Sequence, residues 1–241
     1  MKFSLSDLWS RLPLLTIFLV ALNVLALYFM REVRFLRYVQ ILTVAIFLLY
    51  YHINTFKVRI LIVIILGMFL LREISVFYYG NSLGQIAYII LGCLAYGLIC
   101  FKRLDMIQVL FRDKIAIICT FLFVILNLFM LNELISMVKD SYDGSFQASL
   151  IFLLGIIITL LGAVAVLYNQ VVNSDRSLTF LFFIFCMIIS DVSSLLGYYF
   201  NMGFFYYIDF VGATLGLSFF IHTVLDVRGE REDKELLKSM L

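Results

Sequence analysis

Residues 147–169 read QASLIFLLGIIITLLGAVAVLYN, and this stretch decides the fold because it is long, apolar and free of charged residues. A helix needs about 20 apolar residues to cross the hydrocarbon core of a membrane. Seven more stretches of this kind occur in the chain, separated by short polar or charged breaks. Only helices and closed barrels cross lipid, and no stretch shows the period-two alternation of a barrel strand. The sequence therefore predicts an all-α, polytopic membrane bundle of eight transmembrane helices, at residues 12–30, 36–53, 58–79, 82–101, 115–137, 147–169, 177–200 and 204–226.

The composition of the 241-residue chain supports the same conclusion. Apolar residues make up 64% of the chain and charged residues only 14%, and the mean hydropathy is +1.08. A soluble domain is about a quarter charged, so a soluble globule of this composition would lack a surface compatible with water. The net charge of +2 is too small to indicate a nucleic-acid partner. No long loop interrupts the spans, which predicts a single transmembrane domain over residues 1–226.

Two further sequence features limit the interpretation. The first span is longer than the apolar core of a signal peptide and no A-x-A cleavage pattern follows it, so we expect a retained span. The cysteines lie inside apolar runs without the spacing of metal ligands, so neither a metal site nor a cofactor is expected; they are Cys93, Cys100, Cys119 and Cys186.

The distribution of basic residues predicts the orientation of the bundle. With eight spans, the side that holds both termini carries 13 lysines and arginines against 4 on the other side, and Arg72 lies within a span. The positive-inside rule then puts both termini in the cytoplasm, and we expect a bacterial inner membrane. The charged tail, residues 227–241, is compatible with a short cytoplasmic helix, which is either solvated or docked on a partner.

The first loop departs from the positive-inside rule because three arginines lie on the minority side, Arg31, Arg34 and Arg37. Snorkelling side chains at the membrane surface would explain the cluster. Snorkelling is the favoured explanation, and contact with anionic headgroups or with an acidic membrane-protein partner is the alternative.

Ionisable residues inside the spans mark a candidate site. Arg72 and Glu73 lie in the third span, Asp191 in the seventh and Asp209 in the eighth. At a rise of 1.5 Å per residue, Arg72, Asp191 and Asp209 lie about 8–13 Å below the outer boundary. Unpaired charges are costly at this depth. We therefore predict one polar cluster near the outer face, with Arg72 as its cation and Asp191 or Asp209 as its partner. Such a cluster is either a buried ion pair that sets helix register or a ligand pocket.

Two stretches of the chain resemble the YhhN-type lysoplasmalogenases, a family of eight-helix membrane proteins with both termini inside. The stretches are GAVAVLYN at residues 162–169 and LFFIFCMIISDVSSLLGYYF at residues 181–200. Upstream, LLRE at residues 70–73 lies where the family has a Gly-Asp pair, and LGCLAY at residues 91–96 lies where it has a small-His-x-x-Tyr pattern.

The resemblance implies hydrolysis of the vinyl-ether bond of lysoplasmalogens by two carboxyl groups, here Glu73 and Asp191. Asp191 and Tyr96 match the family pattern, whereas Glu73 replaces an aspartate, Arg72 a glycine and Cys93 a histidine. Thr214 and Ser218 also stand where the family tends to have tyrosine and glutamine. The chemistry needs one protonated carboxyl group and one carboxylate. An adjacent Arg72 would hold both groups ionised, which favours a salt bridge over a proton donor.

These observations favour two functional hypotheses over a transporter or channel, which is weakened because the sequence has no Gly/Pro-interrupted helix pairs of the kind that build sites at the membrane midplane. The first is a divergent member with altered or no catalysis, acting as an accessory subunit of a membrane assembly or as a lipid-binding protein. Its ligand-binding polar cluster would contain Arg72, Tyr96, Ser190 and Asp209. The second is an ether-bond hydrolase that acts on lysophospholipids through Glu73 and Asp191. The expected partners are membrane lipids and a membrane protein that contacts the tail or the first-loop cations Arg31, Arg34 and Arg37.

Overall fold

The computed structural model of this protein describes residues 5–29, 33–55, 58–103, 114–138, 145–200 and 202–240. Within these ranges short connections join the helices and no strand occurs. Eight of the helices are long and apolar enough to cross a membrane, which confirms the predicted all-α class and the number of spans. These helices are α1 (Leu5–Phe29), α2 (Val33–Asn54), α3 (Ile60–Ser75), α4 (Ser82–Phe101), α6 (Lys114–Val138), α7 (Ser145–Val172), α8 (Asp175–Tyr199) and α9 (Gly203–Leu225). A short 3₁₀ turn, η1 (Val76–Tyr78), continues α3, and a final helix, α10, covers Val227–Met240.

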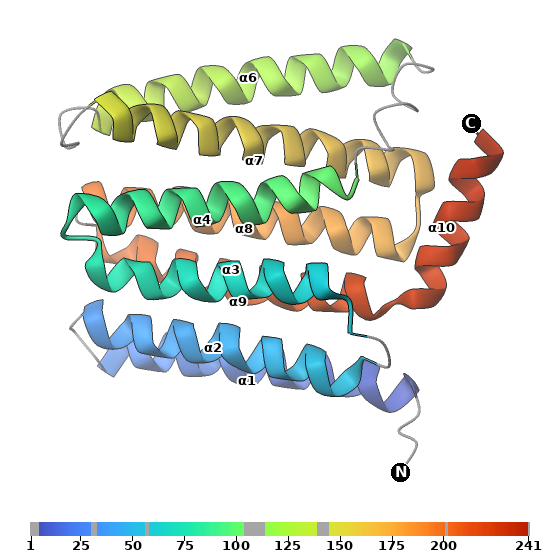
Figure 1. The fold of residues 1–241 in the computed structure, drawn as a ribbon, viewed down its shortest axis with the longest axis horizontal. Helices are drawn as coiled ribbons and strands as arrows, with labels where there is room; N and C mark the ends of the chain where they lie inside the picture. The colour runs from blue at the N-terminus through green and yellow to red at the C-terminus, as the bar shows by residue number, and fades with distance from the viewer. Residues whose placement is uncertain are drawn as a thin grey trace.

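The eight long helices lie side by side along one axis (Figure 1). Helices α1 and α2 form one edge of the bundle, α6 and α7 form the other, and α3, α4, α8 and α9 lie between them. Helix α1 begins at the same end at which α10 lies across the bundle. We call this the α10 end, and the opposite end, where α3 ends and α9 begins, the distal end.

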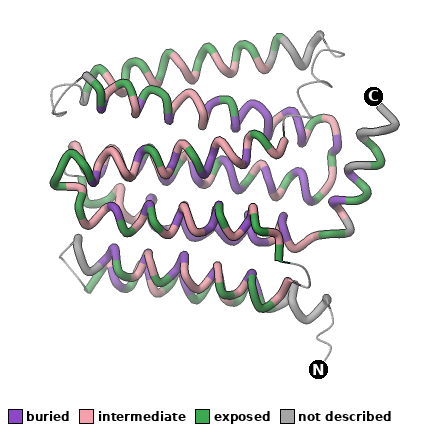
Figure 2. Tube along the Cα trace, viewed as in Figure 1, coloured by how far each residue is buried: buried purple, intermediate pink, exposed green. Residues whose placement is uncertain are grey.

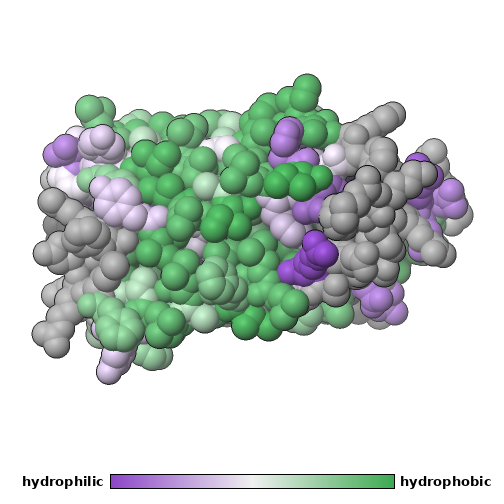
Figure 3. Space-filling view, turned by 90° about the horizontal axis from the view of Figure 1, so that it is seen from below, coloured by the Kyte–Doolittle hydropathy of each residue, from purple (hydrophilic) through white to green (hydrophobic). Residues whose placement is uncertain are grey.

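Buried and exposed residues alternate along these helices (Figure 2). Many of the exposed residues are large and apolar. On α1, for example, Leu14 is 67% exposed and Ile17 66% exposed, whereas Leu19 is fully buried. Figure 3 shows a broad apolar surface along the bundle, with polar side chains gathered toward its ends. In water such a surface would oppose solubility, so it fits an integral membrane protein surrounded by lipid.

Helix α6 is packed differently from the other spans. None of its residues Thr120–Met137 is buried, and the helix packs along α7. The contact is close because Gly155 of α7 has no side chain, and a Cβ atom there would overlap the side chain of Leu131. Helix α6 therefore forms an outer wall of the bundle.

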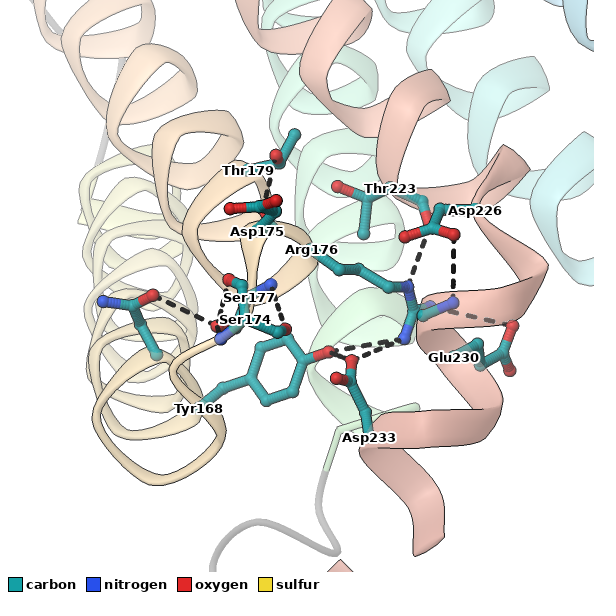
Figure 4. Close-up of polar contacts among 12 residues, drawn as sticks. Tyr168, Ser174, Asp175, Arg176, Ser177, Thr179, Thr223, Asp226, Glu230 and Asp233 are labelled. Carbon is teal, nitrogen blue, oxygen red and sulfur yellow. Dashed lines mark hydrogen bonds and ion pairs between the residues drawn. The ribbon is translucent and has the colours of Figure 1, made fainter. Parts of the chain in front are cut away.

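The charged tail forms helix α10, and this helix is docked on the end of its own bundle. Glu230 and Asp233 are 8% and 3% exposed, and both pair with Arg176 at the start of α8 (Figure 4). Nη1 of Arg176 lies 3.1 Å from Oδ2 of Asp233, and Nε donates to the carbonyl oxygen of Thr223 at 3.1 Å. The tail is thus held by buried charge pairs rather than solvated over its whole length.

Lys102, at the end of α4, provides a pH-dependent test of this arrangement. Burial lowers the pKa of its ammonium group from 10.5 to about 8; Glu230 opposes the shift, and Arg103, Arg59 and Arg176 add to it. Between these two pH values the unfolded chain binds more protons than the folded chain, so stability rises with pH. We expect the free energy of unfolding to increase from about pH 8 to pH 10.5.

The measurement is thermal unfolding in detergent across this pH range, compared with Lys102→Met. The variant should lack the increase, because the titrating group is gone. Cysteines and tyrosines titrate in the same pH range in both proteins. The contribution of Lys102 is therefore the difference in the pH dependence of unfolding between the wild type and Lys102→Met. An equal pH dependence in both would contradict the assignment to Lys102.

Candidate functional site

The distal half of the bundle holds a buried arginine in the last turn of α3. Arg72 is 3% exposed and forms an ion pair with Asp191 of α8. It also donates to the hydroxyl oxygens of Tyr88 and Tyr96 on α4, the latter at 3.1 Å. Tyr96 in turn donates to Oδ2 of Asp191 at 2.7 Å. Three helices are therefore joined by a closed set of hydrogen bonds in which both the cation and the carboxylate are partnered.

The tyrosine rings add to the stabilisation of this cation. The guanidinium carbon of Arg72 lies 4.2 Å from the ring centroid of Tyr88 and 5.6 Å from that of Tyr96. A guanidinium over an aromatic face contributes about 0.5–2 kcal/mol, with the larger values where water is excluded. The surroundings thus compensate the cost of burying Arg72.

A second arginine lies beside the first pair, on α2. Arg37 is 7% exposed, and its Nη1 atom lies 3.5 Å from Oε2 of Glu73 and 3.5 Å from Oδ2 of Asp209. Ser190 donates to Oδ1 of Asp209 at 2.7 Å. The ring of Phe210 lies 5.1 Å from the guanidinium carbon of Arg37. We call these two arginines and their carboxyl partners the distal cluster.

The predicted convergence of spans three, seven and eight is confirmed for these polar residues. Arg72 meets Asp191, one of the two predicted partners, and Glu73 has a partner of its own. Tyr96 and Ser190 each donate a hydrogen bond to a carboxyl group of the distal cluster, Tyr96 to Asp191 and Ser190 to Asp209.

The prediction of a single cation is wrong, because Arg37 was assigned to a surface group in the first loop. Arg37 lies within α2 and faces the bundle, where two carboxyl groups offset its charge. A signal was present in the sequence: Arg37, Gln40 and Thr43 follow one another at helical spacing, and all three are buried. Arg31 and the side chain of Arg34 lie outside the described part of the structure, so their role as a partner contact stays a prediction.

The distal cluster contains three carboxyl groups and two guanidinium groups. Glu73 and Asp209 approach the same nitrogen of Arg37, and Oε2 of Glu73 and Oδ2 of Asp209 accept no hydrogen bond from any described residue. With all groups ionised the cluster would carry one uncompensated negative charge, which is costly in a buried site. One proton shared by the carboxyl groups of Glu73 and Asp209 would neutralise this charge. Glu73 and Asp209 therefore share one cation, Arg37, whereas Asp191, the other carboxyl group of the predicted catalytic pair, is bound to Arg72.

A cavity of about 280 Å³ extends from the distal cluster toward α6. Its polar end is formed by Arg37, Arg72 and Asp191 with hydroxyl-bearing side chains around them. Its apolar wall consists of residues from α6, α7 and α8, namely Met130, Leu131, Leu134, Ile151, Leu154, Ile158, Ile188 and Leu195. Of the described residues that line it, Asp191 is the only one with a carboxylate.

The sequence could not reveal this cavity, because the cavity exists only where α6 lies beside α7 and α8.

In the described part of the chain, no group of three or more His, Cys, Asp and Glu residues is arranged to hold a metal ion. Comparison with protein-family models, curated proteins and solved structures finds no match to the chain. The resemblance to YhhN-type lysoplasmalogenases therefore stays a prediction.

Proposed function

We propose that this protein binds a single-chain membrane lipid, with the chain in the cavity and the polar head at the distal cluster. The observation that carries the proposal is the change in the cavity wall from charged groups at one end to aliphatic side chains at the other. An amphiphile matches both parts, whereas a purely polar or purely apolar ligand would leave one end unmatched. We further propose that the chain is a divergent, non-catalytic relative of the lysoplasmalogenases in a bacterial inner membrane, with both termini in the cytoplasm.

The cluster favours a head group without net charge. Each guanidinium already has a carboxyl partner, so an anionic head would compete with Asp191 or Asp209 for its cation. A zwitterionic or hydroxyl-bearing head can form hydrogen bonds to both signs of charge without displacing either partner. The cavity of about 280 Å³ is also at the lower end of the range for ligand sites, which favours one acyl chain over two.

Hydrolysis of a vinyl-ether lipid is the second candidate, and one observation favours it. The surplus carboxyl group of the Glu73 and Asp209 pair would supply the proton that the vinyl-ether carbon must receive. Two observations weigh against hydrolysis. Neither Glu73 nor Asp209 lines the cavity, and the Asp191 carboxylate is already bound by Arg72 and Tyr96. Release of a fatty aldehyde from lysoplasmalogen by the wild type, abolished in Asp191→Asn, would favour the hydrolase.

The lipid proposal predicts that filling the cavity removes the lipid. Leu134 of α6 lines the cavity, so Leu134→Trp should reduce the co-purified single-chain lipid by at least about fivefold. Leu126 on the same helix is 59% exposed and does not line the cavity, so Leu126→Trp is the matched control and should retain the lipid. Mass spectrometry of lipids extracted after purification in mild detergent gives the ratio of lipid to protein. Equal lipid content in both variants would contradict the proposal.

An accessory role in a larger assembly is compatible with lipid binding. The first-loop cations Arg31 and Arg34 are the expected contacts for such a partner. The same preparation tests this, because a partner subunit would co-purify in a fixed ratio to the chain.

A further inference from the structure

Four cationic side chains gather at the α10 end of the bundle, away from the distal cluster. Arg59 precedes α3, Lys102 and Arg103 follow α4, and Arg176 lies in the first turn of α8. The ends of three separate helices therefore bring four positive charges together. Helix α10 lies across this end of the bundle (Figure 1).

Helix α10 supplies the carboxylates that these cations contact. Glu230 pairs with Arg59 and lies 3.6 Å from Nη2 of Arg176. Asp233 pairs with Arg176 and accepts a hydrogen bond from the hydroxyl of Tyr168 (Figure 4). Arg103 instead packs over the rings of Tyr168 and Phe180, at 4.3 and 5.0 Å from their centroids.

Among the described residues that form these contacts, the charges do not balance. Four cations face two carboxylates, and among the described residues neither Lys102 nor Arg103 has a carboxylate oxygen within 4.0 Å. Burial lowers the pKa of the Lys102 ammonium group to about 8; Glu230 opposes this shift and the three arginines add to it. An anion with about two negative charges would complete the site.

We propose that Arg59, Lys102 and the neighbouring arginines form a binding site for a phosphate monoester, and that Glu230 of α10 occupies part of this site when it is empty. A phosphate monoester carries a charge of about −1.5 to −2 at neutral pH, which matches the surplus. Guanidinium groups bind phosphate oxygens with paired hydrogen bonds, and a lysine ammonium adds a point charge. Arg59 is the accessible member, with its side chain 34% exposed, whereas Arg176 is 3% exposed and remains paired with Asp233.

Glu230 and the phosphate compete for Arg59 in this arrangement. The ligand would displace Glu230 and loosen α10, while the pair of Arg176 and Asp233 keeps the helix attached. The phosphate could belong to a lipid headgroup or to a soluble compound, and both present the same chemistry to the cations. This site is independent of lipid binding in the distal cavity.

Binding is tested with the full-length chain in two arms. In detergent, the probe is inorganic phosphate, titrated by calorimetry at constant ionic strength. In nanodiscs, the probe is phosphatidic acid in a phosphatidylcholine background, with retained lipid measured by native mass spectrometry. Binding in the first arm identifies a soluble ligand and binding in the second a lipid headgroup. Either result supports the site, and binding in neither arm overturns it.

Variants show whether the binding uses these residues. Glu230→Gln should tighten phosphate binding by about fivefold, and Lys102→Gln should weaken it by a similar factor. Glu235→Gln is the matched control, because Glu235 lies exposed on the same helix and carries the same charge. An equal effect of Glu230→Gln and Glu235→Gln would mean that only the net charge of α10 matters, which overturns the proposal.

A measurement on the wild type avoids any effect of substitution on folding. Trypsin cleaves after Arg231, an exposed residue of α10. The probe that binds should accelerate this cleavage several-fold compared with chloride at equal ionic strength, because the loss of the Glu230 pair loosens the part of α10 around Arg231 while Asp233 stays paired with Arg176. Unchanged cleavage under saturating probe would overturn the competition with Glu230.

Discussion

Replacing Arg72 with methionine is expected to lower the free energy of unfolding by about 3–5 kcal/mol. The substitution keeps most of the apolar stem of the side chain but leaves the Asp191 carboxylate without its cation in a buried site. It also removes the donor to the hydroxyl groups of Tyr88 and Tyr96. Thermal or chemical unfolding in detergent measures the loss.

Two further variants show whether the lost ion pair is the cause. Arg231→Met removes an exposed arginine from α10 and should change stability by less than about 0.5 kcal/mol. The double variant Arg72→Met with Asp191→Leu removes both charges and should recover most of the loss, because no uncompensated charge remains. A double variant less stable than Arg72→Met would contradict the ion-pair explanation.

Replacing Gly84 with alanine is expected to destabilise the protein by about 3 kcal/mol. Gly84 lies in the first turn of α4, directly against the end of η1, and a Cβ atom there would overlap the backbone carbonyl of Tyr78. A backbone group cannot rotate away as the end of a flexible side chain can. The turn that follows α3 would therefore have to move, and with it Tyr79, which lines the cavity.

Gly97 on the same helix provides the control. A Cβ atom at Gly97 meets no described atom within 4 Å, so Gly97→Ala should be neutral or raise stability by up to about 1 kcal/mol through helix propensity. Unfolding of both variants under the same conditions compares a blocked position with an open one. Similar stabilities would show that Gly84 is not in close contact with Tyr78.

The hydropathy pattern was sufficient to predict the eight spans, because the need for internal backbone hydrogen bonds in lipid leaves few alternatives. The approximate depth of Arg72, Asp191 and Asp209 also followed from counting residues along each helix. Convergence could be argued from depth and charge alone, since an unpaired ion in lipid is costly. The Arg72 and Asp191 pair was therefore predictable as one of two alternatives.

Other parts of the site could not be derived in this way. Arg37 was grouped with the loop cations because it stands close to them in sequence, yet the rotation of α2 about its axis turns it toward Glu73 and Asp209. The rotation of α2 about its own axis depends on how this helix packs against α3 and α9. The docking of the tail depended in the same way on charges that lie more than 50 residues from Asp233 in sequence, such as Arg176.

The amino-acid sequence by itself determined that this chain is a bundle of membrane helices with charged residues buried toward one end. The sequence determined this because the free-energy cost of placing polar groups in lipid depends on the residues of each segment alone, so each span can be identified without knowing its neighbours. Only the tertiary structure decided which carboxylate each arginine meets, where a cavity remains beside α6, and that α10 packs against arginines at the ends of other helices. These features depend on which helices are neighbours and how each is rotated, and no local stretch of sequence contains that information.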